Sequence, residues 1–376
     1  MNAGLYLHIP FCSAICPYCD FAVLTGGRQA RAAFVRSLLA EIELYRHFPL
    51  SFDTIYFGGG TPSALEPGAI GRVRDALDRN LDVEDGSRIF LEANPEDLSS
   101  ANLKAWRGLG VRTLSLGVQS FRDAELKVLG RRHDTEEARR GVGMALEAGF
   151  DTVSLDLIYG LPNQRLREWE ENLQQAVALG PEHVSCYQLS IHEGTAFGRR
   201  HAQGRLDELS DEVQAEFFDA THRILGAAGF EAYEVSNFAR GPAHRSRHNE
   251  KYWDHTPYLG LGPSAHSFHE SERWWNERDL PAYEERVARG GRPVAGRETL
   301  GADELALEAL MLGLRRTAGI DLSVFRCRYG VDLLERNAER IDRYRQEGFA
   351  ELTDDRLWLT RRGLAIADAV ARDLEL

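Results

Sequence analysis

Three cysteines stand close together near the start of the chain, in the stretch FCSAICPYCDF. Cys12, Cys16 and Cys19 have the spacing C-x3-C-x2-C and directly follow an apolar run that predicts a strand. A [4Fe-4S] cluster takes one ligand on each of its four irons, so three thiolates leave one iron open. The spacing therefore predicts a cluster that does chemistry, because an open iron can bind a further ligand.

Two alternatives explain the same cysteines without a cluster. His8 could complete a Cys3His zinc site, because structural zinc takes four ligands. The three thiols could also be structural residues that lie together by chance. The remaining cysteines, Cys186 and Cys327, lie far along the chain and offer no nearby fourth thiol. An odd total of five cysteines favours a reducing compartment over a disulfide framework.

The triad and four further motifs resemble the oxygen-independent coproporphyrinogen III dehydrogenase group of radical S-adenosylmethionine enzymes. The motifs are YLHIPFC at Tyr6 to Cys12, FGGGTP at Phe57 to Pro62, GVQSF at Gly117 to Phe121 and DLIYGLP at Asp156 to Pro162. In this group the methionine part of S-adenosylmethionine chelates the fourth iron. The resemblance implies a [4Fe-4S] cluster and S-adenosylmethionine as cofactors.

The resemblance also assigns individual residues around these cofactors. Tyr6 and Tyr18 border the cluster, and the glycine loop holds the amino group of the methionine part. The matched positions are Gly59, Gly60 and Thr61 in the loop, and Glu92, Gln119, Arg131, Asp156 and Ser190 as further S-adenosylmethionine contacts. An arginine can pair with the ligand's carboxylate, and acidic side chains can accept hydrogen bonds from ribose hydroxyls. Without the resemblance, the loop also fits a plain tight turn and Arg131 a solvated helix end.

Several features resemble the HemW-type haem-chaperone branch of this group more than its dehydrogenases. The dehydrogenases continue the triad with another cysteine, where this chain has Phe21. Only eleven residues precede Cys12, so we expect no N-terminal segment folded over the active site. His266, in LGLGPSAHSF, stands where the dehydrogenases have an apolar residue.

The motif HNEKYW supplies the positive signal for haem. The motif is typical of the chaperone branch, and this resemblance implies that His248 is an axial ligand for haem iron, with Tyr252 and Trp253 as flat walls for the macrocycle. Within the motif imidazole is the best ligand, with His255 and His266 as rivals nearby. From the residues alone, a polar turn with aromatics packed in the core is the alternative.

The order of elements predicts an α/β fold. Six strand-like runs alternate with amphipathic helical patterns, which indicates a partial six-unit parallel (βα) barrel, also the fold of the resembling group. The runs cover residues 5–9, 54–57, 89–93, 113–118, 152–158 and 183–189. Polar residues recur at the ends of successive strands, so we expect them to share one mouth.

The rest of the chain predicts two further parts. We divide it into a barrel core with the cluster (1–200), a flanking segment with HNEKYW (201–290) and a smaller α+β, winged-helix-like C-terminal domain (297–376), joined by a linker around 290–297. Residues 297–376 hold sixteen acids, thirteen arginines and no lysine, and the whole chain has a net charge of −13. Nucleic acid is therefore not an expected partner.

These observations predict a cytoplasmic protein with no transmembrane segment, since no apolar run is long enough to cross a bilayer as a helix. The resemblance implies a chaperone that binds haem and passes it to acceptor proteins, with a reductant for the cluster and a homodimer as a further expectation. We assign no catalytic residue. The alternatives are a dehydrogenase that uses a 5'-deoxyadenosyl radical to convert coproporphyrinogen III to protoporphyrinogen IX, and a binding module that keeps its cluster only for stability.

Overall fold

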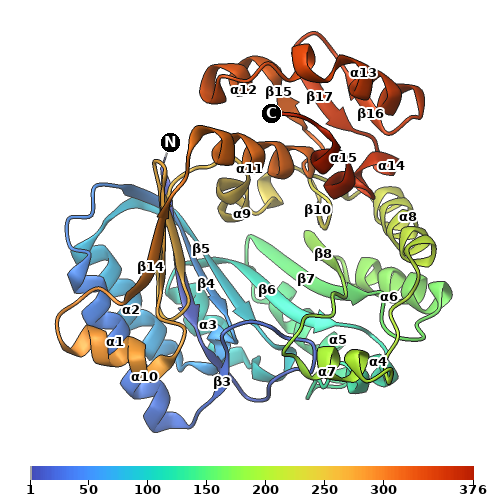
Figure 1. Cartoon of the computed structure of the whole chain (residues 1–376). Coiled ribbons are helices and arrows are strands. Elements are labelled where there is room, and N and C mark those ends of the chain that lie inside the picture. The colour runs from blue at the N-terminus through green and yellow to red at the C-terminus, as the bar shows by residue number, and fades with distance from the viewer. Residues whose placement is uncertain (1) are drawn as a thin grey trace.

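A curved sheet of twelve strands dominates the computed structural model, which describes residues 2–376 (Figure 1). Six of its strands run parallel and follow one another in chain order, which confirms the predicted βα units. They are β1 (Ala3–Ile9), β4 (Ser51–Gly59), β5 (Asp82–Ala93), β6 (Val111–Gln119), β7 (Thr152–Tyr159) and β8 (His183–Gln188). Their carboxyl ends lie at one rim, as parallel pairing requires.

Helices follow these strands and cover the convex side of the sheet (Figure 1). Ser99 caps α3 by accepting a hydrogen bond from the Asn102 N–H, and Asp134 with Glu137 forms a capping box on α5. The helices of the barrel are α1 (Arg28–Leu44), α2 (Pro67–Asn80), α3 (Ser100–Gly108), α4 (Asp123–Val128), α5 (Thr135–Glu147), α6 (Leu166–Leu179), α7 (Ala196–Ala202) and α8 (Asp211–Ala227).

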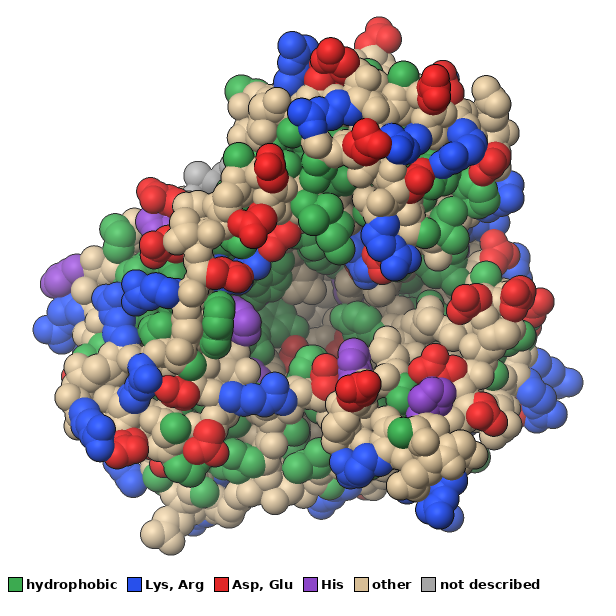
Figure 2. Space-filling view, viewed as in Figure 1, with side chains coloured by type: hydrophobic (Ala, Val, Ile, Leu, Met, Phe, Trp, Pro, Cys, Tyr) green, Lys and Arg blue, Asp and Glu red, His purple; other side chains and the backbone are tan. Residues whose placement is uncertain are grey.

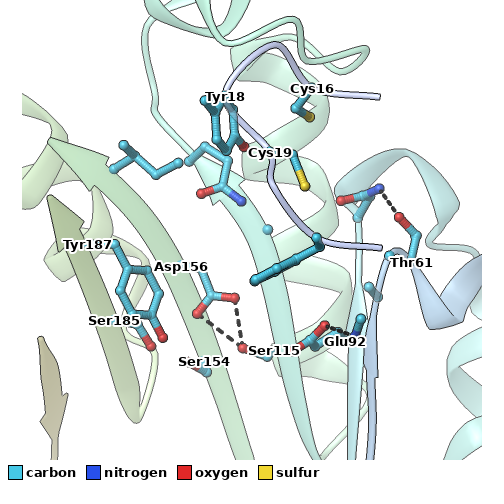
Figure 3. A pocket seen from close by; sticks show the side chains of 18 of the residues that line it. Cys16, Tyr18, Cys19, Thr61, Glu92, Ser115, Ser154, Asp156, Ser185 and Tyr187 are labelled. Atoms are coloured by element: carbon cyan, nitrogen blue, oxygen red, sulfur yellow. Dashed lines mark hydrogen bonds between the residues drawn. The ribbon is translucent and has the colours of Figure 1, made fainter. Parts of the chain in front are cut away.

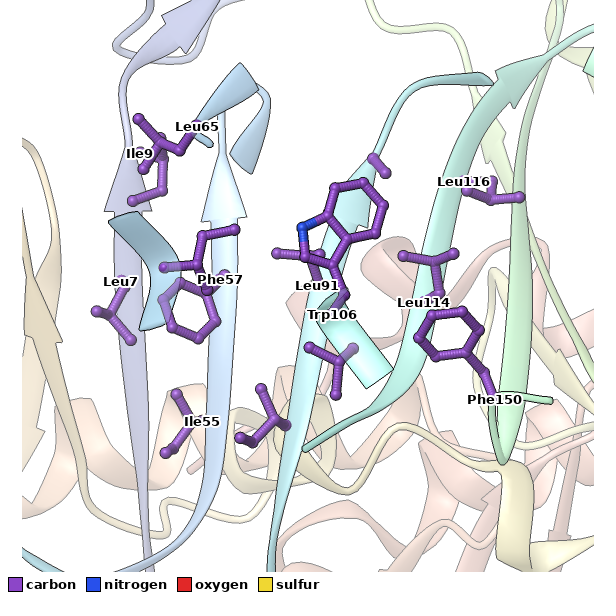
Figure 4. Packing of buried hydrophobic residues seen from close by; sticks show 14 of the residues in the cluster. Leu7, Ile9, Ile55, Phe57, Leu65, Leu91, Trp106, Leu114, Leu116 and Phe150 are labelled. Carbon is purple, nitrogen blue, oxygen red and sulfur yellow. The ribbon is translucent and has the colours of Figure 1, made fainter. Parts of the chain in front are cut away.

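The main core lies between the sheet and these outer helices (Figure 4). Side chains along a strand alternate between its two faces, so every second residue points to the helices. Leu7, Phe57, Leu91 and Leu114 do so and are almost fully buried, and Trp106 of α3 lies beside Leu91 in the same core. The residues between them point to the concave side, where the site lies.

The sheet continues beyond the six predicted strands on both sides. On one side β11 pairs parallel with β1, and β12, β13 and β14 follow antiparallel; on the other, β10 and β9 follow β8. The bounds of these elements are β9 (Glu231–Ala232), β10 (Asn237–Ala239), α9 (Arg247–Trp253), β11 (Tyr258–Leu261), β12 (His266–His269), β13 (Glu272–Asn276), α10 (Leu280–Ala288) and β14 (Val294–Thr299).

Part of the linker expected around 290–297 is instead a strand. Residues from Val294 onward pair with β13, so they belong to the sheet rather than to a free connection. The pairing depends on Gly296, because a Cβ there would lie 2.5 Å from Trp275 Cζ2. The packing of Trp275 on the backbone of Gly296 is a tertiary contact, so local composition does not predict this strand.

The C-terminal elements have a second core, to which Phe218 of α8 also belongs, and they lie beside α8 and across the molecule from α1 and α10 (Figure 1). A three-stranded sheet in the order β15-β17-β16 packs with helices, in agreement with the predicted α+β, winged-helix-like arrangement. The elements are α11 (Ala302–Leu314), β15 (Ile320–Asp321), α12 (Leu322–Tyr329), α13 (Leu333–Gln346), β16 (Ala350–Leu352), β17 (Arg356–Leu359), α14 (Arg361–Leu364) and α15 (Ala367–Asp373). Within residues 2–376, no helix combines the length and apolar character that crossing a bilayer requires.

Candidate functional site

A cavity of about 480 Å³ occupies the concave side of the sheet, and most of the predicted cofactor residues line it (Figure 3). The space-filling view shows a hollow between the barrel and the C-terminal elements, with many hydrophobic side chains around it (Figure 2). The predicted residues in the lining are Cys12, Cys16, Tyr18, Cys19, Gly59, Gly60, Thr61, Glu92, Gln119, Arg131, Asp156 and Ser190. These residues come from distant parts of the chain, so the fold gathers them at one place, as expected from their positions at strand ends.

The cysteine loop forms one wall of this cavity. Cys12 ends the short strand β2 (Phe11–Cys12), which pairs with β3 (Leu24–Thr25), and Cys16 and Cys19 lie in the loop between. The Cys12 Sγ accepts a hydrogen bond from Thr61 Oγ1 at 3.5 Å, and the Cys16 Sγ lies 3.6 Å from Arg131 Nη1. Burial raises the pKa of the Cys12 thiol, and burial with neighbouring thiols raises the pKa of Cys19 to about 11.

The thiols fit a cluster better than a single zinc ion. Among residues 2–376, no three His, Cys, Asp or Glu side chains converge as the ligands of one metal ion do. His8, the fourth ligand of the zinc alternative, lies 2.9 Å from the Ala22 carbonyl through Nε2 and 3.2 Å from the Tyr6 hydroxyl through Nδ1. Thiols spread along one cavity wall fit a group with several metal atoms, each of which takes one ligand.

The glycine loop lies beside the cysteines at the end of β4. Gly59 has a φ of 109°, and a Cβ at Gly60 would lie 2.9 Å from the Phe11 carbonyl oxygen and 3.0 Å from the Cys12 sulfur. Only glycine leaves the backbone free at such a position. The loop therefore exposes peptide groups to the cavity within reach of a ligand on the cysteines, which a plain turn would not require.

Two half-buried carboxylates, Glu92 and Asp156, lie on the cavity floor. Glu92 accepts hydrogen bonds from the Tyr56 hydroxyl at 2.8 Å and from the Gly59 N–H at 3.2 Å. Ser115 donates to both Asp156 oxygens, at 3.2 and 3.0 Å. Burial raises the pKa of Glu92 to about 7, with a further contribution from the Asp156 charge, and burial raises the pKa of Asp156 to about 6.

Arg131 reaches into the cavity from the loop between α4 and α5. It donates hydrogen bonds to the Gly117 carbonyl at 2.8 Å and to the Asn94 side chain, in addition to its contact with Cys16. Its Nε is buried without a hydrogen-bond partner. A half-buried cation with an unused donor beside the cysteines can bind a carboxylate. Arg131 therefore does not stand at a solvated helix end. Nearby, Gln119 ends β6 with a φ of 67°.

The raised pKa of Glu92 leads to a prediction for ligand binding. Because the charged form exists only above about pH 7, S-adenosylmethionine should bind more weakly as the pH falls from 8 to 6. Glu92→Gln should reduce this pH dependence, leaving the part that Asp156 contributes near pH 6. It should also weaken binding at pH 8 about tenfold, since hydrogen bonds to a charged group contribute roughly 1.5–3 kcal/mol. Calorimetric titration at several pH values measures both effects.

The matched control for this titration is Glu147→Gln, on the exposed end of α5. The unliganded Glu92→Gln protein should also unfold at a higher temperature than wild type at pH 8. The pKa of Glu92 is higher in the folded state than in the unfolded state, so the wild-type protein loses stability as the pH rises from about 4.5 to about 7. Gln has no charge to bury and avoids this loss. An unchanged pH profile of binding in Glu92→Gln would contradict the assigned contact.

The motif HNEKYW lies at the opposite end of the barrel from the cysteines, and the structure makes it the helix α9. His248 is 1% exposed, and its ring nitrogens lie 2.9 Å from Thr54 Oγ1 and 2.9 Å from the Tyr252 hydroxyl. Burial lowers the pKa of His248 to about 3. Trp253 packs on Tyr233 with ring centroids 5.9 Å apart. Both imidazole nitrogens are thus engaged within the protein.

Of the other predicted haem contacts, His266 has a different environment. It is exposed at the start of β12, and its ring stacks on Trp275 of β13 at a centroid distance of 5.8 Å. The neighbouring Trp274 points to the outer helices, where its N–H donates to the hydroxyl of Tyr45, the residue that follows α1. Since neighbours on a strand face opposite ways, Trp275 and His266 face the concave side.

Other cavity residues were not identified from the sequence. Tyr56, Asn94, Ser115 and Ser185 line the cavity. Tyr6, which was predicted to border the cluster, is not in this lining and lies behind Tyr56, with ring centroids 6.1 Å apart. Period-two alternation carries the missing signal, because each of the three strand residues lies between two buried apolar neighbours. The inward position alone, however, does not distinguish a ligand contact from a structural hydroxyl.

Comparisons with known proteins agree with this geometry. Residues 6–176 match the model of the radical SAM superfamily, and residues 300–366 match that of the HemN C-terminal domain. The solved coproporphyrinogen III oxidase (HemN) from Escherichia coli superposes with a TM-score of 0.84 over 99% of this chain and 89% of its own. Its sequence identity of 23% makes this a likeness of fold.

Curated relatives match along nearly the whole chain. The heme chaperone HemW of Mycobacterium tuberculosis is 38% identical over 376 residues, which cover 99% of this chain and 94% of the relative. The heme chaperone HemW of Bacillus subtilis is 33% identical over 368 residues, which cover 97% of each chain. The chain therefore belongs to the HemW family of radical S-adenosylmethionine proteins.

Proposed function

We propose that this protein is a haem chaperone, which binds haem and transfers it to acceptor proteins in the cytoplasm. The observation that carries the proposal is the full-length similarity to relatives named heme chaperone HemW. The dehydrogenase alternative rests on a shared fold at 23% identity, and fold alone does not determine function. Phe21, which lines the cavity where the dehydrogenases carry a cysteine, also supports the chaperone.

The cofactors of the proposal are a [4Fe-4S] cluster and S-adenosylmethionine. Cys12, Cys16 and Cys19 would hold the cluster, which supplies one-electron chemistry when bound. Arg131 would bind the carboxylate of S-adenosylmethionine, and Glu92 would accept hydrogen bonds from hydroxyl groups.

Haem itself fits the concave face of the antiparallel extension better than helix α9. His266 is exposed there, Trp275 provides a flat surface beside it, and burial with the charge of Arg273 lowers the pKa of His266. A neutral imidazole is the form that ligates haem iron. His248 would have to break two hydrogen bonds before it could do so. We propose His266 as the axial ligand, with the HNEKYW helix as support of the fold beneath the cavity.

Two assays with the anaerobically reconstituted protein test the function. Addition of haem should give a Soret band, and a haem-free acceptor protein should then take up the haem. Incubation with coproporphyrinogen III, S-adenosylmethionine and a reductant should yield no protoporphyrinogen IX. Turnover of coproporphyrinogen III would establish the dehydrogenase instead. Haem binding that persists without transfer would point to a binding module.

Substitution of the two histidines tests the ligand. His266→Ala should shift the Soret band and weaken haem binding at least tenfold, because the axial nitrogen is lost. His248→Ala should leave the spectrum close to wild type and lower thermal stability, because Thr54 and Tyr252 lose a buried partner. His201→Ala, at an exposed position on α7, serves as the control. The opposite pattern would assign the ligand to HNEKYW.

A further inference from the structure

A second cavity, of about 440 Å³, opens on the outer side of the cysteine loop. The end of α4 and the helix α7 form its sides, and Pro17 of the cysteine loop lies in its lining. We refer to this cavity as the basic groove, because Lys127, Arg200 and Arg205 line it. It is distinct from the cofactor cavity, since the two have no lining residue in common.

The basic groove is in direct contact with the cysteine loop. Pro17 is covalently bonded to Cys16, and its carbonyl accepts a hydrogen bond from the Phe197 N–H at 2.8 Å. Gly130 packs so closely on Pro17 that a Cβ there would lie 2.7 Å from the proline Cδ. The next residue, Arg131, extends to the inner side and contacts the Cys16 sulfur. The lining of the groove is therefore the back of the cluster site.

The charge of the groove is opposite to that of the whole protein. Lys127, Arg200 and Arg205 are exposed, and within residues 2–376 none of them lies within 4 Å of a carboxylate in an ion pair. Asp207 is the single acidic residue in the lining. Three cations against one anion give a local positive charge on a chain whose net charge is −13.

An exposed apolar side chain accompanies these cations. Val128, next to Lys127 at the end of α4, is 43% exposed and lines the groove. An apolar centre with surrounding charges is typical of weak, transient protein contacts, of which redox encounters are the smallest. Charges of this kind increase the rate of encounter with an oppositely charged partner more than they increase affinity.

We propose that the basic groove is the docking surface for a small acidic protein that carries one electron. On docking, one electron passes from the carrier to the cluster on Cys12, Cys16 and Cys19; the carrier is oxidised, the cluster is reduced, and no bond forms or breaks. The inference rests on the cluster of the proposed function. Docking behind the loop lets the electron enter while a ligand occupies the cofactor cavity.

Rates of cluster reduction test the proposal. The probe is a reduced flavodoxin, an acidic flavin-carrying protein, and the readout is the loss of visible cluster absorbance after anaerobic mixing. In K127E/R200E/R205E the bimolecular rate at low ionic strength should fall at least tenfold, because electrostatic steering contributes about ten- to a thousandfold. The wild-type rate should fall with added salt, and the rate of the variant should not.

The matched control is R72E/R79E/K104E, which makes the same charge change at exposed positions of α2 and α3. Its rate should stay close to wild type. Reduction by dithionite, a small reductant that needs no docking surface, should be equal in all three proteins and shows that the cluster is intact. An unchanged flavodoxin rate in the groove variant overturns the proposal, and so does equal slowing with dithionite. Loss of haem binding with normal reduction would also overturn it, because the groove would then bind haem.

Discussion

Replacement of Cys12, Cys16 and Cys19 with serine should leave a folded protein that binds no iron after anaerobic reconstitution. The three thiols line one cavity, and each would supply the ligand of one iron. Serine keeps the size of the side chain but is a poor ligand for iron at neutral pH. The visible absorbance of the cluster should therefore disappear, and the iron and sulfide content should fall to background.

The control for this loss is Cys327→Ser, because Cys327 is exposed on α12 and lies outside the cavity. It should retain the full iron content of wild type. Each single serine variant should reduce cluster content strongly, since the loop provides no fourth thiol to substitute. Full reconstitution of the triple variant would assign the cluster to other ligands, and a requirement for Cys186 or Cys327 would do the same.

The parallel part of the fold is predictable because it depends on local pattern. Strands β1 and β4 to β8 alternate buried and cavity-facing residues, and the helices between them carry readable caps such as Ser99. Both signals lie within short stretches of sequence.

The antiparallel extension could not be predicted in this way. Strands β12 to β14 are short and depend on partners that are distant in the sequence. Trp274 donates a hydrogen bond to Tyr45, the residue that follows α1, and Asn276 donates one to the buried Glu41. Burial raises the pKa of Glu41 to about 7, and Tyr283, Asn276 and the Gly262 N–H donate hydrogen bonds to it. This hydrogen-bond network determines where the extension packs, and local composition does not predict the network.

The residues of the candidate site also differ in how far local sequence predicts their position. Glu92 and Asp156 line the cavity, because this class of fold brings polar residues of successive strands to one mouth. Their role as S-adenosylmethionine contacts came from the resemblance and stays a prediction. For HNEKYW, residue types alone also fit a polar turn with aromatics packed in the core. The haem-binding role came from the resemblance to the chaperone branch and stays a prediction. The environment of His248 depends on Thr54, which lies in a different βα unit, and only the packing of α9 on β4 brings them together.

Gly60→Ala should abolish S-adenosylmethionine binding and reduce the stability of the cysteine loop. The added methyl group would lie 2.9 Å from the Phe11 carbonyl oxygen, 3.0 Å from the Ile9 carbonyl oxygen and 3.0 Å from the Cys12 sulfur. Two of these atoms belong to the backbone and cannot rotate away, so the loop must move. Overpacking of this kind costs about 1–3 kcal/mol.

The displacement would affect the ligand more than the fold, because the glycine loop and Cys12 both face the cofactor cavity. Calorimetry should detect no S-adenosylmethionine binding to Gly60→Ala, while thermal denaturation shows a moderate loss of stability. Gly68→Ala is the matched control, since a Cβ at this exposed position on α2 meets nothing within 4 Å. Alanine is the better helix former, so this control should be as stable as wild type or slightly more stable. Wild-type binding by Gly60→Ala would show that the loop can move without loss of the site. Gly60 would then no longer count as an S-adenosylmethionine contact.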